Sequence, residues 1–87
     1  MDTVQDIIPE FDTNCKKLQS NKYWKLTKRQ AQILVCMLFC KTISQAAGIL
    51  GISCKTSSKH FHESKSKIGA ESYFELGAVI KEFLQKQ

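Results

Sequence analysis

Apolar residues recur at helical spacing along most of this chain, and residues typical of turns divide them into separate segments. The clearest segment runs from Thr27 to Cys40. Its apolar residues fall on one broad side of a helix: Ala31, Ile33, Leu34, Met37 and Leu38. Thr27 and Gln30 have the spacing of a capping box, in which two side chains satisfy free backbone N–H groups at a helix start. We therefore predict a scaffold helix over this segment.

The next stretch is expected to form a short helix followed by a longer one. Ser44 to Leu50 is the short helix. Its inward side is small and apolar: Ile43, Ala46, Ala47 and Leu50. Gly51 suits the left-handed conformation that ends a helix, and Ser53 suits the cap of the next one. That next helix is predicted over about residues 54–67 and ends at Gly69.

The last segment is predicted to be a helix that extends to about Leu84. Ser72 and Glu75 form a second capping box at its start. One stripe of this helix is apolar, with Val79 beside it: Tyr73, Leu76, Ile80, Phe83 and Leu84. We expect the stripe to pack into the core, and it is wide enough to suit pairing with a second chain as well.

The N-terminal residues have a weaker helical pattern. Their apolar side chains share one helical face: Val4, Ile7, Ile8, Phe11, Cys15 and Leu18. Pro9 interrupts this pattern, and because proline suits a first helical turn, we expect a short helix from about Pro9 to Leu18. Asn21 to Lys25 is interpreted as a linker whose Tyr23 and Trp24 fold back onto the core.

Together these segments predict one all-α domain. Four helices occupy residues 26–87, and an acidic arm and linker over residues 1–25 carries the short helix. A chain of 87 residues buries only somewhat more than about 60% of its unfolded surface. The core is therefore expected to be thin, and dimerisation would add to its stability.

Charge is distributed unevenly along the chain. Residues 1–14 hold four acidic residues and no basic one, which gives −4, while the remainder holds all 13 Lys and Arg and reaches +9. Such a basic remainder suits a polyanion such as nucleic acid, although a solvated basic surface that aids solubility has the same composition.

Part of this positive charge lies on the helix predicted over residues 54–67. Its basic side chains are Lys55, Lys59, Lys65 and Lys67, with His60 and His62 between them and Glu63 as the one acidic residue. The inward side of this helix is sparse: Ser57, Phe61, Ser64 and the following Ile68. A helix with so little to bury and so much positive charge favours a role on the surface.

Residues that could carry catalysis are missing from the pattern. The chain has no paired carboxylates, phosphate loop or nucleophile with a matching base, so we expect no enzyme, no cofactor and no small-molecule ligand. Cys36 and Cys40 share a helical face, and with His60 and His62 they leave a metal site open as an alternative. Buried cysteine acting as a small apolar side chain is favoured over it. With no apolar run long enough for a bilayer and no secretory signal, we expect a cytoplasmic protein.

Several motif residues stand in the order and spacing of a known DNA-binding family: Leu26 to Gln30, Ile43 with Ser44, Ile52 with Ser53, Thr56, His60, and Lys67 to Gly69. Over about residues 26–84 the chain resembles the LuxR-type helix-turn-helix domain, including the stand-alone regulators of the spore-regulator type. The chain departs from the family pattern at five positions: Gln30, Cys40, Ser57, Ser58 and Ser64.

The resemblance implies a transcriptional regulator that binds double-stranded DNA as a homodimer, with the basic helix in the major groove. It assigns base reading to Ser58, Lys59 and His62. It assigns phosphate contacts to Arg29, Lys41, Lys55, Thr56 and Lys65. It assigns dimerisation to Tyr73, Leu76, Ile80, Phe83 and Leu84.

Three alternatives stay open. The serines of the basic helix favour an interaction module that pairs with a full-length regulator of the same family through its last helix and makes no firm DNA contact. A region like those of sigma factors shares the helix order but fits the Lys67 to Gly69 exit less well. In the third alternative, the acidic arm, from Asp2 to Asp12, covers the basic helix as a mimic of DNA.

Overall fold

The structure is a computed structural model that describes Ile8, residues 10–39 and residues 42–86, and this part of the chain is helical without a strand. The helices are α2 (Phe11–Gln19), α3 (Lys28–Phe39), α4 (Ile43–Leu50), α5 (Cys54–Ile68) and α6 (Tyr73–Gln85). The all-α prediction is therefore confirmed. Among the described residues, no helix combines the length and the apolar character needed to cross a bilayer.

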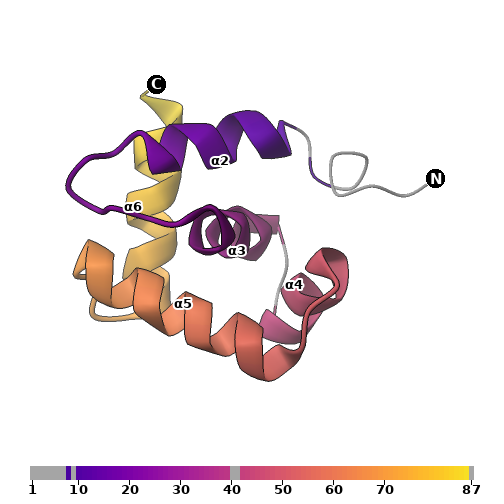
Figure 1. Ribbon diagram of the computed structural model, residues 1–87. Helices are drawn as coiled ribbons and strands as arrows, with labels where there is room; N and C mark the ends of the chain where they lie inside the picture. The colour runs from indigo at the N-terminus through magenta and orange to yellow at the C-terminus, as the bar shows by residue number, and fades with distance from the viewer. Residues whose placement is uncertain (1–7, 9, 40–41, 87) are drawn as a thin grey trace.

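Helix α3 is the centre of the fold and contacts each of the other four described helices. In Figure 1, α2 runs along one side of α3 and α5 along the opposite side, while α6 stands across one end and reaches both. Ile33, Leu34 and Val35 are buried on consecutive sides of α3. The predicted scaffold helix is thus wrapped by its neighbours, which leaves the far side of α5 open.

The predicted caps of α3 and α5 are present. The Thr27 hydroxyl accepts the N–H of Gln30 at 3.2 Å, and the Gln30 side-chain oxygen accepts the N–H of Thr27 at 3.1 Å. At α5, the Ser53 hydroxyl accepts the N–H of Thr56 at 3.1 Å. Gly69 ends α5 with a φ of 82°, a left-handed conformation that glycine adopts without strain. These caps can be predicted from the sequence because the bonded residues of each cap are only three positions apart.

Two predicted helix starts differ from the structure. Helix α4 begins at Ile43 rather than Ser44, because the Thr42 hydroxyl accepts the N–H of Gln45 at 3.1 Å and caps the helix one residue earlier. Helix α2 begins at Phe11, after Glu10 in a left-handed conformation with φ of 56°. The part of the prediction that concerns Pro9 lies outside the described residues.

The second predicted capping box is half formed. The Ser72 hydroxyl accepts the N–H of Glu75 at 3.1 Å, as the pattern predicts. The Glu75 carboxylate instead accepts the N–H of Glu71, one residue before the cap, at 3.4 Å. The start of α6 is still capped, and the carboxylate lies in its first turn, where the helix dipole favours negative charge.

The N-terminal helix shares the core of the domain. Ile8, Phe11, Cys15 and Leu18 are buried in the same cluster as the apolar residues of α3 and α6. Of the two linker residues predicted to fold back onto the core, Trp24 does so, with its ring centred 5.0 Å from that of Phe83. The prediction for Tyr23 was wrong, because its side chain is 92% exposed. A boundary at residue 25 therefore does not separate two cores.

Burial also decides the chemistry of Cys15. Removal from water, aided by the nearby Asp12 carboxylate, raises the pKa of Cys15 from 9.0 to about 12. A thiol with such a pKa stays protonated at neutral pH and is a poor metal ligand or nucleophile. Cys15 thus acts as a small apolar side chain, the role that the sequence favours.

Candidate nucleic-acid interface

The turn between α4 and α5 has a fixed geometry. Gly51 takes the left-handed conformation, with φ of 69°, and the N–H of Ile52 reaches back to the carbonyl of Ala47 at 3.0 Å. This is the bond pattern of a Schellman motif, which closes the end of α4 and redirects the chain. Ser53 then begins α5 after only one further residue. Because so few residues connect α4 and α5, and their backbone is hydrogen-bonded, the angle between the two helices is fixed.

Helix α5 has one buried side and one open side. Its buried residues are Ser57, Phe61 and Ser64, as the sequence predicts. Because α-helical side chains advance by 100° a residue, the opposite side carries four exposed residues: Lys55, Lys59, His62 and Ser66. We call these four residues the open strip of α5. The strip is thus opposite the buried side of α5, the side that packs against the rest of the domain.

The three residues assigned to base reading lie next to one another on α5. Lys59 and His62 are exposed on the open strip, and Ser58 is half-buried at its edge, four residues before His62. The His62 ring has its centre 6.1 Å from that of Phe61 and 6.3 Å from that of Tyr73. The imidazole is therefore supported by two aromatic rings while its edge stays open to a ligand.

Two residues assigned to phosphates lie at opposite ends of α5. Lys55 is exposed in the first turn, and Lys65 is half-buried in the last turn, with its Nζ 6.0 Å from the centre of the Tyr73 ring. Ten residues of helix separate them by about 15 Å. A major groove is about 12 Å wide, so this separation suits the phosphate backbones on its two sides.

The other predicted phosphate residues are placed differently. Thr56 is exposed, and its hydroxyl oxygen accepts a bond from the Ser53 hydroxyl at 2.9 Å, which leaves its own O–H able to donate. Arg29 is half-buried in the first turn of α3, on a different helix from the open strip. Lys41 lies outside the described residues. The fold thus gathers Lys55, Thr56 and Lys65 on α5 but does not bring Arg29 to the same helix face.

The five residues assigned to dimerisation are divided by the fold. Leu76 and Ile80 are 2% and 1% exposed inside the monomer core, so they have no surface to offer a partner. Phe83 and Leu84 are half-buried against that core. Tyr73 keeps 56% of its surface exposed. As an assignment of interface residues, Leu76 and Ile80 were wrong, because the α6 stripe is needed to cover α3.

The exposed aromatic residue of α6 that the sequence prediction missed is Phe74, which is 87% exposed. It lies beside an apolar groove of about 400 Å³ between α3 and α6. The groove is lined by Leu34, Met37, Leu38, Phe61, Tyr73, Phe74, Leu76, Gly77 and Ile80. The sequence could have indicated this exposure, because Phe74 lies outside the inward stripe of the helix and is therefore not needed to fill the core.

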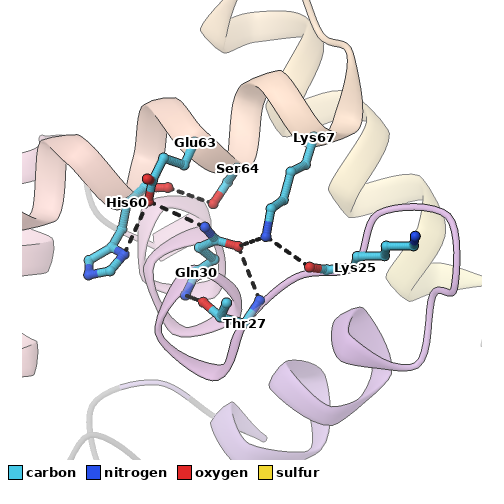
Figure 2. Close-up of polar contacts among 7 residues, drawn as sticks. All are labelled: Lys25, Thr27, Gln30, His60, Glu63, Ser64 and Lys67. Carbon is cyan, nitrogen blue, oxygen red and sulfur yellow. Dashed lines mark hydrogen bonds and ion pairs between the residues drawn. The ribbon is translucent and has the colours of Figure 1, made fainter.

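The sequence identifies Lys67 as a basic residue of α5 but not its partners, which form a polar cluster between α3 and α5. Its Nζ donates to the Gln30 side-chain oxygen at 2.8 Å and to the carbonyl of Lys25 at 2.9 Å. Figure 2 shows this lysine reaching down from α5 to both acceptors. Lys67 therefore bridges α5 to the start of α3 and to the residues before it, and it is not a freely solvated cation.

The same cluster holds the only acidic residue of α5. The Gln30 amide nitrogen donates to the Glu63 carboxylate at 3.4 Å, and the His60 Nδ1 lies 3.7 Å from the same oxygen. The Glu63 carboxylate is therefore directed toward Gln30 of α3 (Figure 2). Neither Lys55 nor Lys59 pairs with a carboxylate of the described residues. The open strip consequently presents positive charge without an internal counter-ion.

The described residues contain no group of three or more His, Cys, Asp or Glu that could hold a metal ion. Cys36 is buried within α3, and Cys40 lies outside the part of the chain that the structure describes. His60 is directed toward Glu63, whereas His62 is exposed beside Tyr73. The fold therefore places the two histidines of the alternative metal site in different surroundings.

Comparison with known proteins gives no match: no family model, curated protein or solved structure corresponds to this chain.

Proposed function

We propose that this protein is a transcriptional regulator of the LuxR type that binds double-stranded DNA, with α4 and α5 as its helix-turn-helix and α5 in the major groove. One observation carries the proposal. The open strip of α5 presents Lys55 and Lys59 without carboxylate partners, while the only acidic residue of the helix is held on another side by Gln30. The strip lies on a capped helix whose opposite side is buried, so it is available to a groove.

The placement of basic residues at helix starts supports an anionic partner. Lys28 and Arg29 lie in the first turn of α3, and Lys55 lies in the first turn of α5, and neither turn has an acidic residue. The positive end of a helix dipole disfavours cations by about 0.3–1 kcal/mol each. Such a cost to folding is offset if phosphates bind at these places, since they interact with the lysines and with the helix end together.

The side chains on the strip favour moderate base discrimination. Lys59 can donate to the acceptors of guanine, and His62 and Ser58 can make weaker or water-mediated contacts. Arginine makes the most selective two-bond contact with guanine, but the only arginine of the chain is Arg29, on α3. We therefore expect affinity to come mainly from phosphates, with sequence preference added by Lys59.

The test is binding to duplex DNA over a range of salt, followed by selection of preferred sites from a random pool. Each phosphate that the protein neutralises contributes about −0.9 to the slope of log affinity against log salt. Lys59→Gln should weaken the selected site by about 1–3 kcal/mol and relax one base position. Lys81→Gln, which removes the same charge from an exposed residue of α6, is the matched control. Affinity that does not change with salt would rule out the proposal.

A second candidate function follows from the exposed aromatic residues of α6. Phe74 is 87% exposed and Tyr73 is 56% exposed beside the groove between α3 and α6. Exposed aromatic residues beside a groove are typical of an interface with another protein. On this reading the chain pairs with a full-length LuxR-type regulator and prevents it from binding DNA. A mixed complex that fails to bind the regulator's operator would support it, whereas a specific footprint by the pure chain would reject it.

A further inference from the structure

The loop between α2 and α3, together with the helix turns on either side of it, carries a second concentration of positive charge. Residues 16–29 hold six of the 13 basic residues and no acidic residue. Lys22 and Lys25 are exposed, and Tyr23 between them is 92% exposed. We call Lys22, Tyr23 and Lys25 the basic loop. All three side chains extend into solvent and contribute no burial to the core, so core packing does not explain why these residues are here.

The backbone of the basic loop is fixed by its neighbours. The Asn21 side-chain oxygen accepts the N–H of Tyr23 at 2.9 Å and the N–H of Trp24 at 3.2 Å. The Trp24 ring packs on Phe83 of α6. With Asn21 forming the turn and Trp24 anchored inward, Tyr23 is directed away from the core. The loop thus presents its lysines from a defined position.

Lys67 holds the end of the basic loop against α5. Its Nζ donates to the carbonyl of Lys25 at 2.9 Å, and Lys25 has the left-handed φ of 50° that is uncommon for a residue other than glycine. Such a conformation persists where the surrounding contacts determine it. Figure 2 shows the Lys25 carbonyl directed at Lys67, while the Lys25 side chain points away from the polar cluster.

We propose that the basic loop is a second phosphate-binding surface of the same protein, and that Lys67 is a positioning residue that holds it beside the C-terminal end of α5. This inference rests on the proposed function, because it takes duplex DNA as the partner. With α5 in the major groove, one phosphate backbone passes the end of α5 that carries Lys65. Lys22 and Lys25 extend the positive surface from that end, and the Tyr23 hydroxyl adds a donor of a kind that often contacts phosphates.

The experiment measures the salt dependence of binding to a random-sequence duplex of two helical turns for four proteins. The loop variant is Lys22→Gln with Lys25→Gln. The control variant is Lys81→Gln with Lys86→Gln, which removes the same charge from one exposed residue of α6 and from the exposed residue at its C-cap. The C-terminal end of α6 lies away from α5 (Figure 1). The remaining two proteins are the wild type and Lys67→Met. The wild-type slope serves as the reference for all three variants.

The loop variant should lose about 1.8 from the magnitude of the slope of log affinity against log salt, and the control should match the wild type. If the wild type binds with a steep slope and the loop variant keeps it, the basic loop is not part of the interface, although the proposed function stands. If the slopes of the loop variant and the control variant fall by the same amount, net charge rather than the position of the lysines sets the affinity. The inference is then wrong. A wild type without salt-dependent binding would reject the proposed function itself.

Lys67→Met separates positioning from direct contact. If Lys67 acts through Lys25, its replacement should lower the slope in the wild-type background. In a fifth protein, the loop variant that also carries Lys67→Met, it should change the slope no further. If Lys67→Met lowers the slope in both the wild-type background and the loop variant, Lys67 itself binds a phosphate. That result would contradict the positioning role. Circular dichroism and thermal unfolding of each variant confirm that the compared proteins are folded.

Discussion

Two serines on the buried side of α5 have the same exposure and different surroundings. Ser57 and Ser64 are both fully buried. The Ser64 hydroxyl donates to the carbonyl of His60 at 2.7 Å, whereas the Ser57 hydroxyl has no hydrogen-bond partner among the described residues. A buried polar group without a partner costs about 1–3 kcal/mol. The sequence predicts that both serines face inward, but not which hydroxyl lacks a partner, because that depends on the atoms packed against each one.

The first prediction compares Ser57→Ala with Ser64→Ala. Both changes gain the same helix propensity, since both residues lie inside α5. Ser57→Ala also removes the hydroxyl without a partner and should raise the free energy of unfolding by about 1 kcal/mol more than Ser64→Ala does. For a domain of this size, that difference corresponds to a Tm difference of about 4–8 °C in thermal unfolding. Equal Tm values would show that the Ser57 hydroxyl is satisfied in solution.

At the scale of elements, the polar cluster joins α5 to the start of α3. Gln30 accepts bonds from Lys67 and from the N–H of Thr27, and donates to Glu63. An amide can serve such a site because it has both a donor and an acceptor, whereas a carboxylate in its place would repel Glu63. The capping half of this role is visible in the sequence. The contacts with α5 join residues more than 30 positions apart, so only the packing of the two helices establishes them.

The second prediction tests this cluster with Gln30→Ala against Gln32→Ala. Gln30 is buried, and its loss leaves the Thr27 N–H without its acceptor and takes from the Lys67 ammonium one of its two acceptors, the Lys25 carbonyl remaining. Unfolding in urea should show a loss of about 1–3 kcal/mol for Gln30→Ala. Gln32 lies on the same helix and is half-buried, and its replacement should stay within about 0.5 kcal/mol of the wild type. If both variants lose a similar free energy of unfolding, the polar cluster contributes little to stability.

At the scale of the whole molecule, α6 covers the core with one side and exposes aromatic residues beside it. The buried side explains why a stripe predicted for dimerisation is largely internal: a chain of 87 residues has few other apolar residues with which to cover α3. What α6 leaves for a second chain is Tyr73 and Phe74 beside the groove against α3. We therefore expect the proposed homodimer to use Phe74 rather than Leu76.

The third prediction separates these two roles of α6. Phe74→Glu should leave the free energy of unfolding of the monomer nearly unchanged and should convert a dimer to a monomer in sedimentation, because it places a charge on an exposed apolar surface. Leu76→Ala creates a cavity in the core and should cost about 2–5 kcal/mol of stability. If the wild type itself sediments as a monomer at concentrations of tens of micromolar, the homodimer proposal fails, and the Phe74 surface is left for a different partner.

The sequence by itself determined the helices, most of their caps and the inward side of α5. Helical spacing and capping boxes act within three or four residues, so the signals at Thr27, Ser53 and Gly69 are complete in the local sequence. Only the tertiary structure decided that Lys67 reaches Lys25, that Glu63 is directed toward α3, and that Leu76, expected in the core from the sequence, keeps no surface for a second chain. These placements follow from how α3, α5 and α6 pack, and a side chain's partner across a helix interface is set by that packing rather than by its neighbours in sequence.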